Sequence, residues 1–263
     1  MKIQITDLFS GSVLFEHEAE NNTVSLTLVA AVKAGANLGG AYLAGAYLDG
    51  ANLGGANLAG ASLDGASLAG ANLTGANLDR AYLDGANLDG ATLARANLAG
   101  ASLDGASLDG ASLGGAYLGG AYLAGAYLDG ANLVRANLAR ANLAGASLAG
   151  ANLTGANLDR AYLDGANLDG ANLDGEVLNK APISLINLQW SILVTGQYMR
   201  IGCQRHTHEE WRDFTDAKIR NMAIDALAFW RKWKAPLLAI CHANHEAPAA
   251  TDPVGAESEE AES

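Results

Sequence analysis

An unbroken five-residue repeat is the feature that most constrains how this chain can fold. From Ala36 to Gly175 the sequence consists of 28 consecutive five-residue units, with Ala at the first position and Leu at the third position of every unit. The second position is Asn, Tyr, Ser or Thr, and the fourth and fifth are mostly Gly, Ala, Asp or Arg. A five-residue period keeps no apolar stripe on an α-helix, and the recurring Gly would cost a helix about 1 kcal/mol each time. The array is therefore not helical.

The same spacing suits short β-strands joined by turns. Two apolar positions separated by one outward position match strand alternation, and stacking such units in layers about 4.8 Å apart makes a β-solenoid. Burial of each Leu contributes roughly 2 kcal/mol, so the array can offset much of its ordering entropy. Gly closes 23 units, and Arg closes the other five. Because Arg takes this place, we expect the fifth position not to require a left-handed backbone.

The A-(N/D)-L-x-x pattern resembles that of the pentapeptide-repeat family. The resemblance implies a right-handed, four-sided β-helix, in which four units form one coil and the first and third residues of each unit point inward. On that geometry the 28 units make seven coils. The expected fold class is mainly β, with this solenoid lying between an N-terminal hairpin-helix cap and a small α+β C-terminal cap.

Composition and local pattern divide the chain into four parts. We expect an N-terminal cap over residues 1–35, formed by a β-hairpin and a short helix, and the β-helix over residues 36–180. Residues 181–245 contain all four tryptophans and are expected to form the C-terminal cap. Residues 246–263 are rich in Glu, Ala, Ser and Pro and are expected to be disordered.

Within the C-terminal cap the pattern predicts two or three short strands over residues 183–202, a helical turn over 207–214, and a helical region from Thr215 to about Asn244. These flanking segments resemble those of phage and prophage pentapeptide-repeat proteins. The protein is expected to be a monomer or a dimer through this cap. The apolar residues of the last helix can either form the dimer contact or be buried in the cap itself; they are Leu227, Trp230, Leu237 and Leu238.

Sorting the units by side of the solenoid separates the charges. Two neighbouring sides, which we call the acidic half, carry nine of the twelve repeat aspartates and six of the seven repeat tyrosines, whereas all five repeat arginines lie on the other two sides. The aspartates are Asp49, Asp64, Asp84, Asp89, Asp104, Asp109, Asp129, Asp164 and Asp169. Four tyrosines form one column, Tyr42, Tyr82, Tyr122 and Tyr162, and the other two are Tyr47 and Tyr127.

The acidic half allows two interpretations. Aspartates stacked one coil apart repel by about 1 kcal/mol in bulk water, so we expect them not to stabilise the fold. They can simply form a solvated face that keeps the protein soluble, or they can attract a basic protein partner while the tyrosines act as anchors. The formal charge of −12 argues against direct binding to nucleic acid, which needs a basic patch.

DNA mimicry is an alternative that the family resemblance implies. Some pentapeptide-repeat proteins imitate duplex DNA and occupy the DNA-binding saddle of type II topoisomerases such as gyrase. Twelve aspartates over about 34 Å of axis are sparse beside one phosphate per ~1.7 Å of duplex DNA. The array also lacks the loops that interrupt the coils of quinolone-protecting relatives.

Metal binding and catalysis are the remaining possibilities. Candidate zinc ligands are Cys203, His206, Cys241 and His245, although nothing in the sequence brings the two clusters together, and buried Cys with surface His is the alternative. The repeats contain no Cys, His or Lys, so we expect no enzyme and no cofactor. The chain shows no secretory signal at its start and no long apolar run, which predicts a cytoplasmic protein without a membrane segment.

A longer repeat lies above the five-residue one. Residues 66–90 recur letter for letter at 146–170, which is four whole coils further along the chain. Recent duplication of the array explains this better than selection for two identical docking sites. The leading hypothesis is therefore a non-enzymatic interaction scaffold whose acidic half binds a basic protein.

Overall fold

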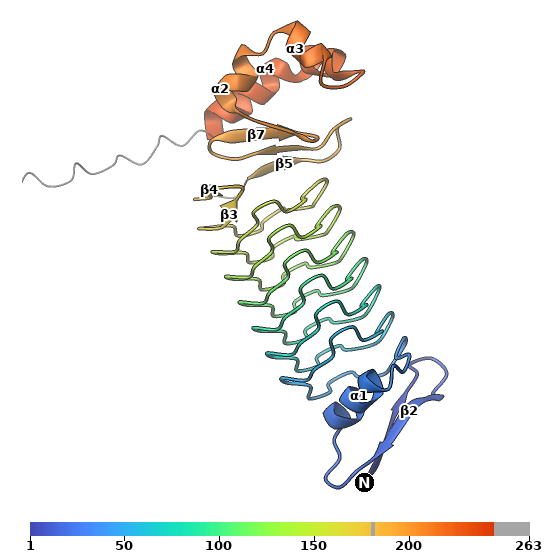
Figure 1. Ribbon diagram of the computed structural model, residues 1–263. Helices are drawn as coiled ribbons and strands as arrows, with labels where there is room; N and C mark the ends of the chain where they lie inside the picture. The colour runs from blue at the N-terminus through green and yellow to red at the C-terminus, as the bar shows by residue number, and fades with distance from the viewer. Residues whose placement is uncertain (180–181, 245–263) are drawn as a thin grey trace, which may run out of the picture.

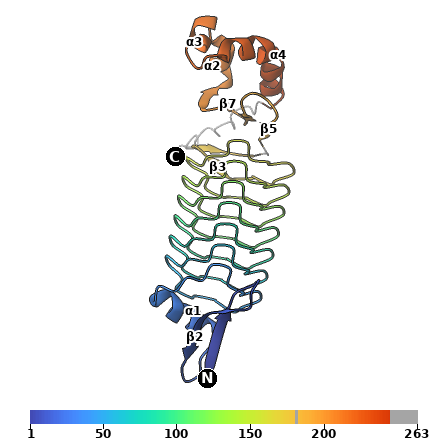
Figure 2. The same ribbon diagram turned by 90° about the vertical axis from the view of Figure 1, so that its right-hand side faces the viewer.

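The repeats stack into a long column with a folded segment at each end. The computed structural model describes residues 1–179 and 182–244, and Figures 1 and 2 show the hairpin and helix at one end and the sheet with its helices at the other. The predicted tail, residues 246–263, lies outside the described residues. Within the described ranges, no helix combines the length and apolar character needed to cross a lipid bilayer.

The N-terminal segment covers the open edge of the first coil. Strands β1 (Lys2–Thr6) and β2 (Val13–Glu18) form an antiparallel hairpin, and helix α1 (Val24–Lys33) follows. The hairpin reaches the first coil through hydrogen bonds from Leu8 N to Gly40 O at 2.7 Å and from Tyr42 N to Thr6 O at 2.8 Å. Backbone groups that would otherwise pair with another chain are thereby satisfied.

Parallel pairing between successive coils holds the array together. Each second-position residue forms a parallel bridge with the second-position residue of the same side in the next coil, as Tyr82 does with Ser102. In a typical unit Ser102 N donates to Ala81 O at 2.9 Å and Leu103 N donates to Tyr122 O at 2.7 Å. Four units therefore make one coil, as expected from the family resemblance.

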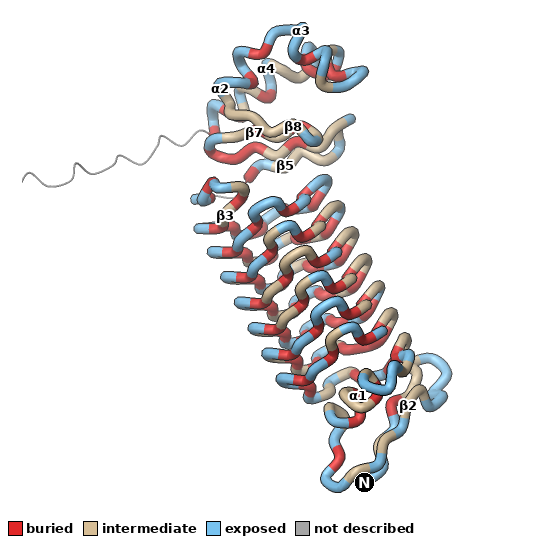
Figure 3. The backbone as a smooth tube through the Cα atoms, in the orientation of Figure 1, coloured by how far each residue is buried: buried red, intermediate tan, exposed pale blue. Residues whose placement is uncertain are grey.

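The interior consists of the two invariant positions. All 28 repeat leucines are at most 7% exposed, and the first-position alanines are buried in all but the first coil, where two are half-buried. Figure 3 shows this buried material running along the whole column. The prediction that Leu and Ala point inward is confirmed.

The fifth position is left-handed in every unit, so the expectation that it need not be is wrong. Its glycines have positive φ, and the five arginines adopt φ between 53° and 61° as well. The stems of three arginines extend over the fifth-position glycine of the next coil; one example is Arg95 Cγ, which lies 3.7 Å from where a Cβ on Gly115 would stand. Stacking of the coils imposes this left-handed turn, so the five arginines adopt a backbone conformation that is strained for residues other than Gly.

In a typical unit of the inner coils, backbone pairing leaves one N–H without a backbone acceptor, that of the fourth residue. In thirteen units the Asn at the second position of the same unit accepts it through Oδ1, as Asn97 does from Ala99 N at 3.2 Å. In seven others an Asp of the preceding coil accepts it, as Asp109 Oδ1 does from Asp129 N at 2.9 Å. These side chains do for the turn what an N-cap residue does for a helix.

The seven capping aspartates correct the expectation that the acidic half contributes nothing to stability. They are Asp49, Asp64, Asp84, Asp89, Asp104, Asp109 and Asp129. Four of them also accept a hydrogen bond at 2.5 Å from a serine hydroxyl of the next coil, as Asp84 does from Ser102. A charge-assisted hydrogen bond stabilises the fold by about as much as the repulsion between exposed neighbouring carboxylates destabilises it, so the stacked aspartates are tolerated.

The C-terminal segment places three helices on a small antiparallel sheet. A short hairpin ends the array, β3 (Asn172–Leu173) with β4 (Glu176–Val177). The sheet has the order β5-β6-β7-β8, with strands at Ile183–Leu185, Ile192–Val194, Tyr198–Ile201 and Gln204–Thr207. The helices are α2 (His208–Asp213), α3 (Asp216–Arg220) and α4 (Ala226–Asn244).

Two details of this segment differ from the predicted pattern. The sheet contains a fourth strand, β8, directly before α2, because Thr207 forms a capping box with Glu210 and so begins the helix only after the strand has paired. The helical region expected from Thr215 to Asn244 is interrupted between Arg220 and Ala226. Pro236 lies inside α4.

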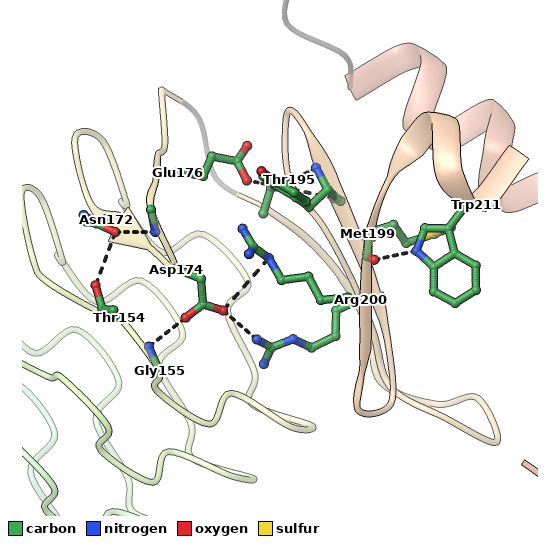
Figure 4. A network of polar contacts seen from close by, with 12 residues as sticks. Thr154, Gly155, Asn172, Asp174, Glu176, Thr195, Met199, Arg200 and Trp211 are labelled. Atoms are coloured by element: carbon green, nitrogen blue, oxygen red, sulfur yellow. Dashed lines mark hydrogen bonds and ion pairs between the residues drawn. The ribbon is translucent and has the colours of Figure 1, made fainter. Parts of the chain in front are cut away.

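Carboxylates of the last hairpin attach the sheet to the solenoid (Figure 4). Asp174 accepts from Gly155 N at 2.7 Å through Oδ1 and from Arg200 at 2.8 Å through Oδ2. The buried Glu176 accepts from Thr195 Oγ1 at 2.5 Å and from Gln197 N at 2.9 Å. Both acids join a coil to the sheet, so they define how the two parts meet.

The left-handed fifth position gives a prediction with a matched control. Gly105 has φ +66° and nothing within 4 Å of a built Cβ, so Gly105→Ala isolates backbone strain and should lower the free energy of unfolding by about 1 kcal/mol. Gly114 has an ordinary φ and only a 3.9 Å contact, so Gly114→Ala should leave stability unchanged or raise it slightly. Urea unfolding followed by circular dichroism measures both. Equal effects would show that the turn does not impose the left-handed backbone.

The capping role of the acidic residues gives a second prediction. Asp109→Ala removes the acceptor of Asp129 N–H and should cost about 1 kcal/mol of unfolding free energy, whereas Asp109→Asn keeps an oxygen there and should cost less. Asp169 lies in the last coil, with no further coil to cap, so Asp169→Ala serves as the control. If the Asn and Ala variants of Asp109 unfold at the same urea concentration, the carboxylate has no capping role.

Candidate functional site

The tyrosines of the acidic half stand out as large side chains that the fold leaves uncovered. In one column the exposed fractions are 55% for Tyr42, 43% for Tyr82, 54% for Tyr122 and 44% for Tyr162. Tyr47 and Tyr127 on the neighbouring side are also exposed. Small polar residues occupy the coils between them in the same column, namely Ser62, Ser102 and Asn142. The solenoid therefore accepts Ser where it carries Tyr.

The predicted aspartates lie beside these tyrosines. All nine are exposed or half-buried at the surface of the acidic half. Seven of them cap the next coil, and the other two, Asp164 and Asp169, belong to the last coil. Tyr162 Oη donates to Asp164 at 3.3 Å. The structure thus keeps the predicted residues together on one face.

Three of the repeat tyrosines lie in units that an aspartate of the preceding coil caps. A unit with Tyr at its second position has no Asn to accept the fourth-position N–H. In the unit of Tyr82 that N–H is accepted by Asp64 at 3.1 Å, and in the unit of Tyr122 it is accepted by Asp104 at 2.8 Å. An Asp in one coil can therefore replace the missing Asn for a Tyr or Ser in the next, as it does for Tyr82, Tyr122 and Tyr127. The units of Tyr117 and Tyr162 have Ala in place of this Asp.

A shallow groove opens between successive tyrosines of the column. It has a volume of about 380 Å³ and is lined by Arg80, Tyr82, Ser102, Asp104 and Tyr122, together with the backbone at Ala81 and Gly100. Arg80 closes the unit before Tyr82 and so reaches this groove from the corner. Arg140 and Arg160 close units in the same column as Arg80, so the acidic half has three positive side chains along this edge, which sorting residues by side did not predict.

Sequence reasoning also missed the serines that bond to the aspartates. Ser67, Ser102, Ser107 and Ser147 each donate to an Asp of the preceding coil. The signal was present as Asp and Ser recurring at a fixed spacing of 18, but it becomes meaningful only when the coil length and the unpaired N–H are known.

The candidate zinc ligands do not form a cluster among the described residues. Cys203 is exposed, whereas Cys241 is buried in α4 against Met199, and its burial raises the pKa of the thiol to about 11. A thiolate is therefore disfavoured at neutral pH. His206 stacks edge-on against Trp211 and Phe214, and its Nδ1 lies 3.5 Å from a carboxylate oxygen of Glu210. His245 lies outside the described residues, and no group of three potential metal ligands occurs in residues 1–179 and 182–244.

The apolar residues considered for dimerisation pack within their own cap. Trp230 and Leu237 are buried in its core, and Leu227 and Leu238 pack against that core half-buried. Trp211 anchors the helices to the sheet by donating from its indole nitrogen to Met199 O at 2.6 Å. These contacts supply the burial that a dimer interface would otherwise have to provide.

Comparisons with known proteins identify the repeats. A family model described as pentapeptide repeats (8 copies) matches residues 36–75, 76–115, 106–145 and 136–175, whereas no curated protein matches the chain. A solved pentapeptide repeat protein, Rfr23 from the cyanobacterium Cyanothece, is 41% identical over 35% of this chain and 61% of its own, with a TM-score of 0.33. The match thus spans less than two thirds of that protein.

Two further solved structures show similarity to the array. HetL, a pentapeptide repeat protein involved in heterocyst differentiation regulation in the cyanobacterium Nostoc, is 33% identical over 54% of this chain and 85% of its own, with a TM-score of 0.27. QnrB1, a plasmid-mediated fluoroquinolone resistance protein, is 22% identical over 50% of this chain and 84% of its own, with a TM-score of 0.33.

The matched region coincides with the stacked units and excludes both ends, so the likeness of the flanking segments to phage proteins stays a prediction. No catalytic family is indicated. Because the family model covers more than half of the chain, from residue 36 to 175, this protein belongs to the pentapeptide repeat family, for which the expected architecture is a right-handed β-helix.

Proposed function

We propose that this protein is a non-enzymatic scaffold whose acidic, tyrosine-bearing half binds a basic protein partner. The observation that carries the proposal is the exposure of the tyrosines rather than the number of aspartates. Seven of the nine aspartates already serve as backbone caps, so their presence alone does not require a partner. The tyrosines have no such role in the fold.

The column itself shows that Tyr is not needed for folding. Ser62 and Ser102 occupy the same column and form the same parallel bridges as Tyr82. Replacing a small hydroxyl side chain by an exposed phenol adds apolar surface to water without adding core. Rigid amphipathic rings of this kind are enriched where proteins bind one another, and they frequently dominate the binding energy.

The surrounding charge selects the kind of partner. The caps place Oδ1 of the seven capping aspartates against the next coil, yet these side chains stay exposed or half-buried at the surface. A surface with this charge attracts basic partners over a distance and repels acidic ones, which raises association rates at low salt. A basic protein is therefore the partner class that the acidic half fits.

DNA mimicry remains a second candidate because the carboxylates of the acidic half become dense in the middle of the array. Two neighbouring coils carry two each on this half, Asp84 with Asp89 and Asp104 with Asp109. At about 4.8 Å per coil this is one charge per ~2.4 Å, which approaches one per ~1.7 Å in duplex DNA. The dense stretch covers only part of the column, so the general scaffold is the leading proposal.

The tyrosine column provides the direct test of the scaffold. We expect the variant with Ser at positions 42, 82, 122 and 162 to keep its unfolding transition but to capture basic proteins from a cell lysate at least about ten-fold less efficiently. Quantitative mass spectrometry after crosslinking at about 50 mM and 300 mM salt measures this loss and the salt dependence. Tyr117→Ser, on another side, should change nothing. Equally efficient capture of the same proteins by the unaltered protein and by the variant with four serines would refute the proposal.

An assay with purified gyrase tests the second candidate function, DNA mimicry. If the dense carboxylates imitate DNA, the protein should inhibit supercoiling by purified gyrase, or protect gyrase from a quinolone, at micromolar concentration. Replacing Asp84, Asp89, Asp104 and Asp109 by Asn should abolish this effect, because Asn keeps the cap oxygen and removes the charge. Absence of any effect across the titration would exclude DNA mimicry of gyrase and leave the scaffold standing.

A further inference from the structure

The tyrosine column alternates large and small side chains at a regular distance. Tyr42, Tyr82, Tyr122 and Tyr162 are separated by two coils each, and parallel bridges connect every step of the column. With a strand spacing of about 4.8 Å, successive tyrosines stand ~9.6 Å apart along the axis. Three intervals, which we call slots, lie between them and are occupied by Ser62, Ser102 and Asn142; the one at Ser102 opens as a groove. The tyrosines of this column therefore recur with a period of two coils.

The slot between Tyr82 and Tyr122 shows what such a site can hold. It forms the groove described above, with Ser102 between the two tyrosines and Arg80 and Asp104 at its sides. Its midpoint is about 4.8 Å along the axis from each tyrosine, near the ~4.0–4.5 Å of apolar contact. Because Arg80 and Asp104 both lie at this slot, their charges offset each other and neither sign of charge is favoured inside it. A compact, uncharged ring or aliphatic side chain fits better.

Only one regular backbone conformation matches the period without distortion. A polyproline II helix rises ~3.1 Å per residue with three residues per turn, so every third residue faces the same side at about 9.3 Å. Seven residues of α-helix advance about 10.5 Å, and two residues of β-strand about 6.8 Å. Across the two intervals that join three slots, the mismatch is about 0.6 Å for polyproline II but ~1.8 Å for the α-helix.

The chemistry of the surface agrees with this period. Proline-rich segments in the polyproline II conformation dock into grooves lined by aromatic side chains, and their conformation is already present before binding. The neighbouring side of the acidic half presents stacked carboxylates at Asp89, Asp109 and Asp129. Three residues per turn direct one of the two residues between successive prolines toward this column, and a basic residue there would face its carboxylates while the prolines occupy the slots.

We propose that the tyrosine column binds a basic, proline-rich segment in the polyproline II conformation, with every third residue seated between two tyrosines. This inference rests on the proposed scaffold function and names the class of its partner. In this proposal the tyrosines fix the register of the bound segment, and the aspartates select for its positive charge.

The test compares two labelled peptides of identical composition with the full chain. One peptide of about 13 residues carries four Pro at every third position with Arg and Lys between, and the other carries the same residues with the four Pro at every fourth position. Fluorescence anisotropy should show at least about ten-fold tighter binding of the three-residue register. The double variant Tyr82→Ser with Tyr122→Ser should lose that preference, whereas Tyr117→Ser should keep it.

The outcomes separate this inference from the function on which it rests. Equal binding of both peptides that still depends on Tyr82 and Tyr122 would overturn the polyproline inference and leave the scaffold proposal intact. Binding that is insensitive to the tyrosines and is abolished by about 300 mM salt would overturn both, because the surface would then act only through its charge. Register preference with tyrosine dependence supports the inference.

Discussion

The structure depends on how each coil satisfies the backbone of its neighbours. Hydrogen bonds between coils and within turns pair four of the five N–H groups in a unit, as in the unit that contains Leu103. The remaining donor, the fourth-position N–H, has no backbone acceptor. In thirteen of the 28 units Asn in the same unit accepts its hydrogen bond, and in seven others Asp in the preceding coil does, so residues in neighbouring coils are linked wherever such an Asp meets this requirement.

This requirement explains why the surface is uneven. On the sides that carry mostly Asn, most units cap themselves and the fourth position is free to vary among Gly, Ala, Thr, Val and Asp. On the acidic half the cap comes mostly from the coil before, which releases the second position for Ser or Tyr. Negative charge there is partly a consequence of the fold. It follows that the tyrosines, and not the charge, are the better indication of a binding surface.

Much of the architecture follows from the sequence because the same pattern recurs in 28 units, and every unit supports the same prediction. The inward Leu and Ala and the four-unit coil are confirmed by burial and by the parallel bridges. The left-handed arginines and the capping aspartates were not predicted, because each depends on a neighbour one coil away that a single unit does not reveal. Arg95 illustrates this, since its stem lies over Gly115. The C-terminal cap has no repeat, so local signals alone predicted neither β8 nor the interruption after Arg220.

The duplication within the array bears on whether the tyrosines have a role. The copy four coils further on extends beyond the longest identical stretch, because residues 41–53 also recur at 121–133. Between these two matching stretches the copies differ at outward positions such as Ser62 and Asn142, whereas the inward Leu and Ala are unchanged. Tyr42 and Tyr82 each keep their counterpart, at Tyr122 and Tyr162. Duplication by whole coils preserves the column, but it does not create the two-coil interval between Tyr42 and Tyr82, which was present within the first copy. The spacing that matches an extended ligand therefore has an origin separate from the event that doubled its length.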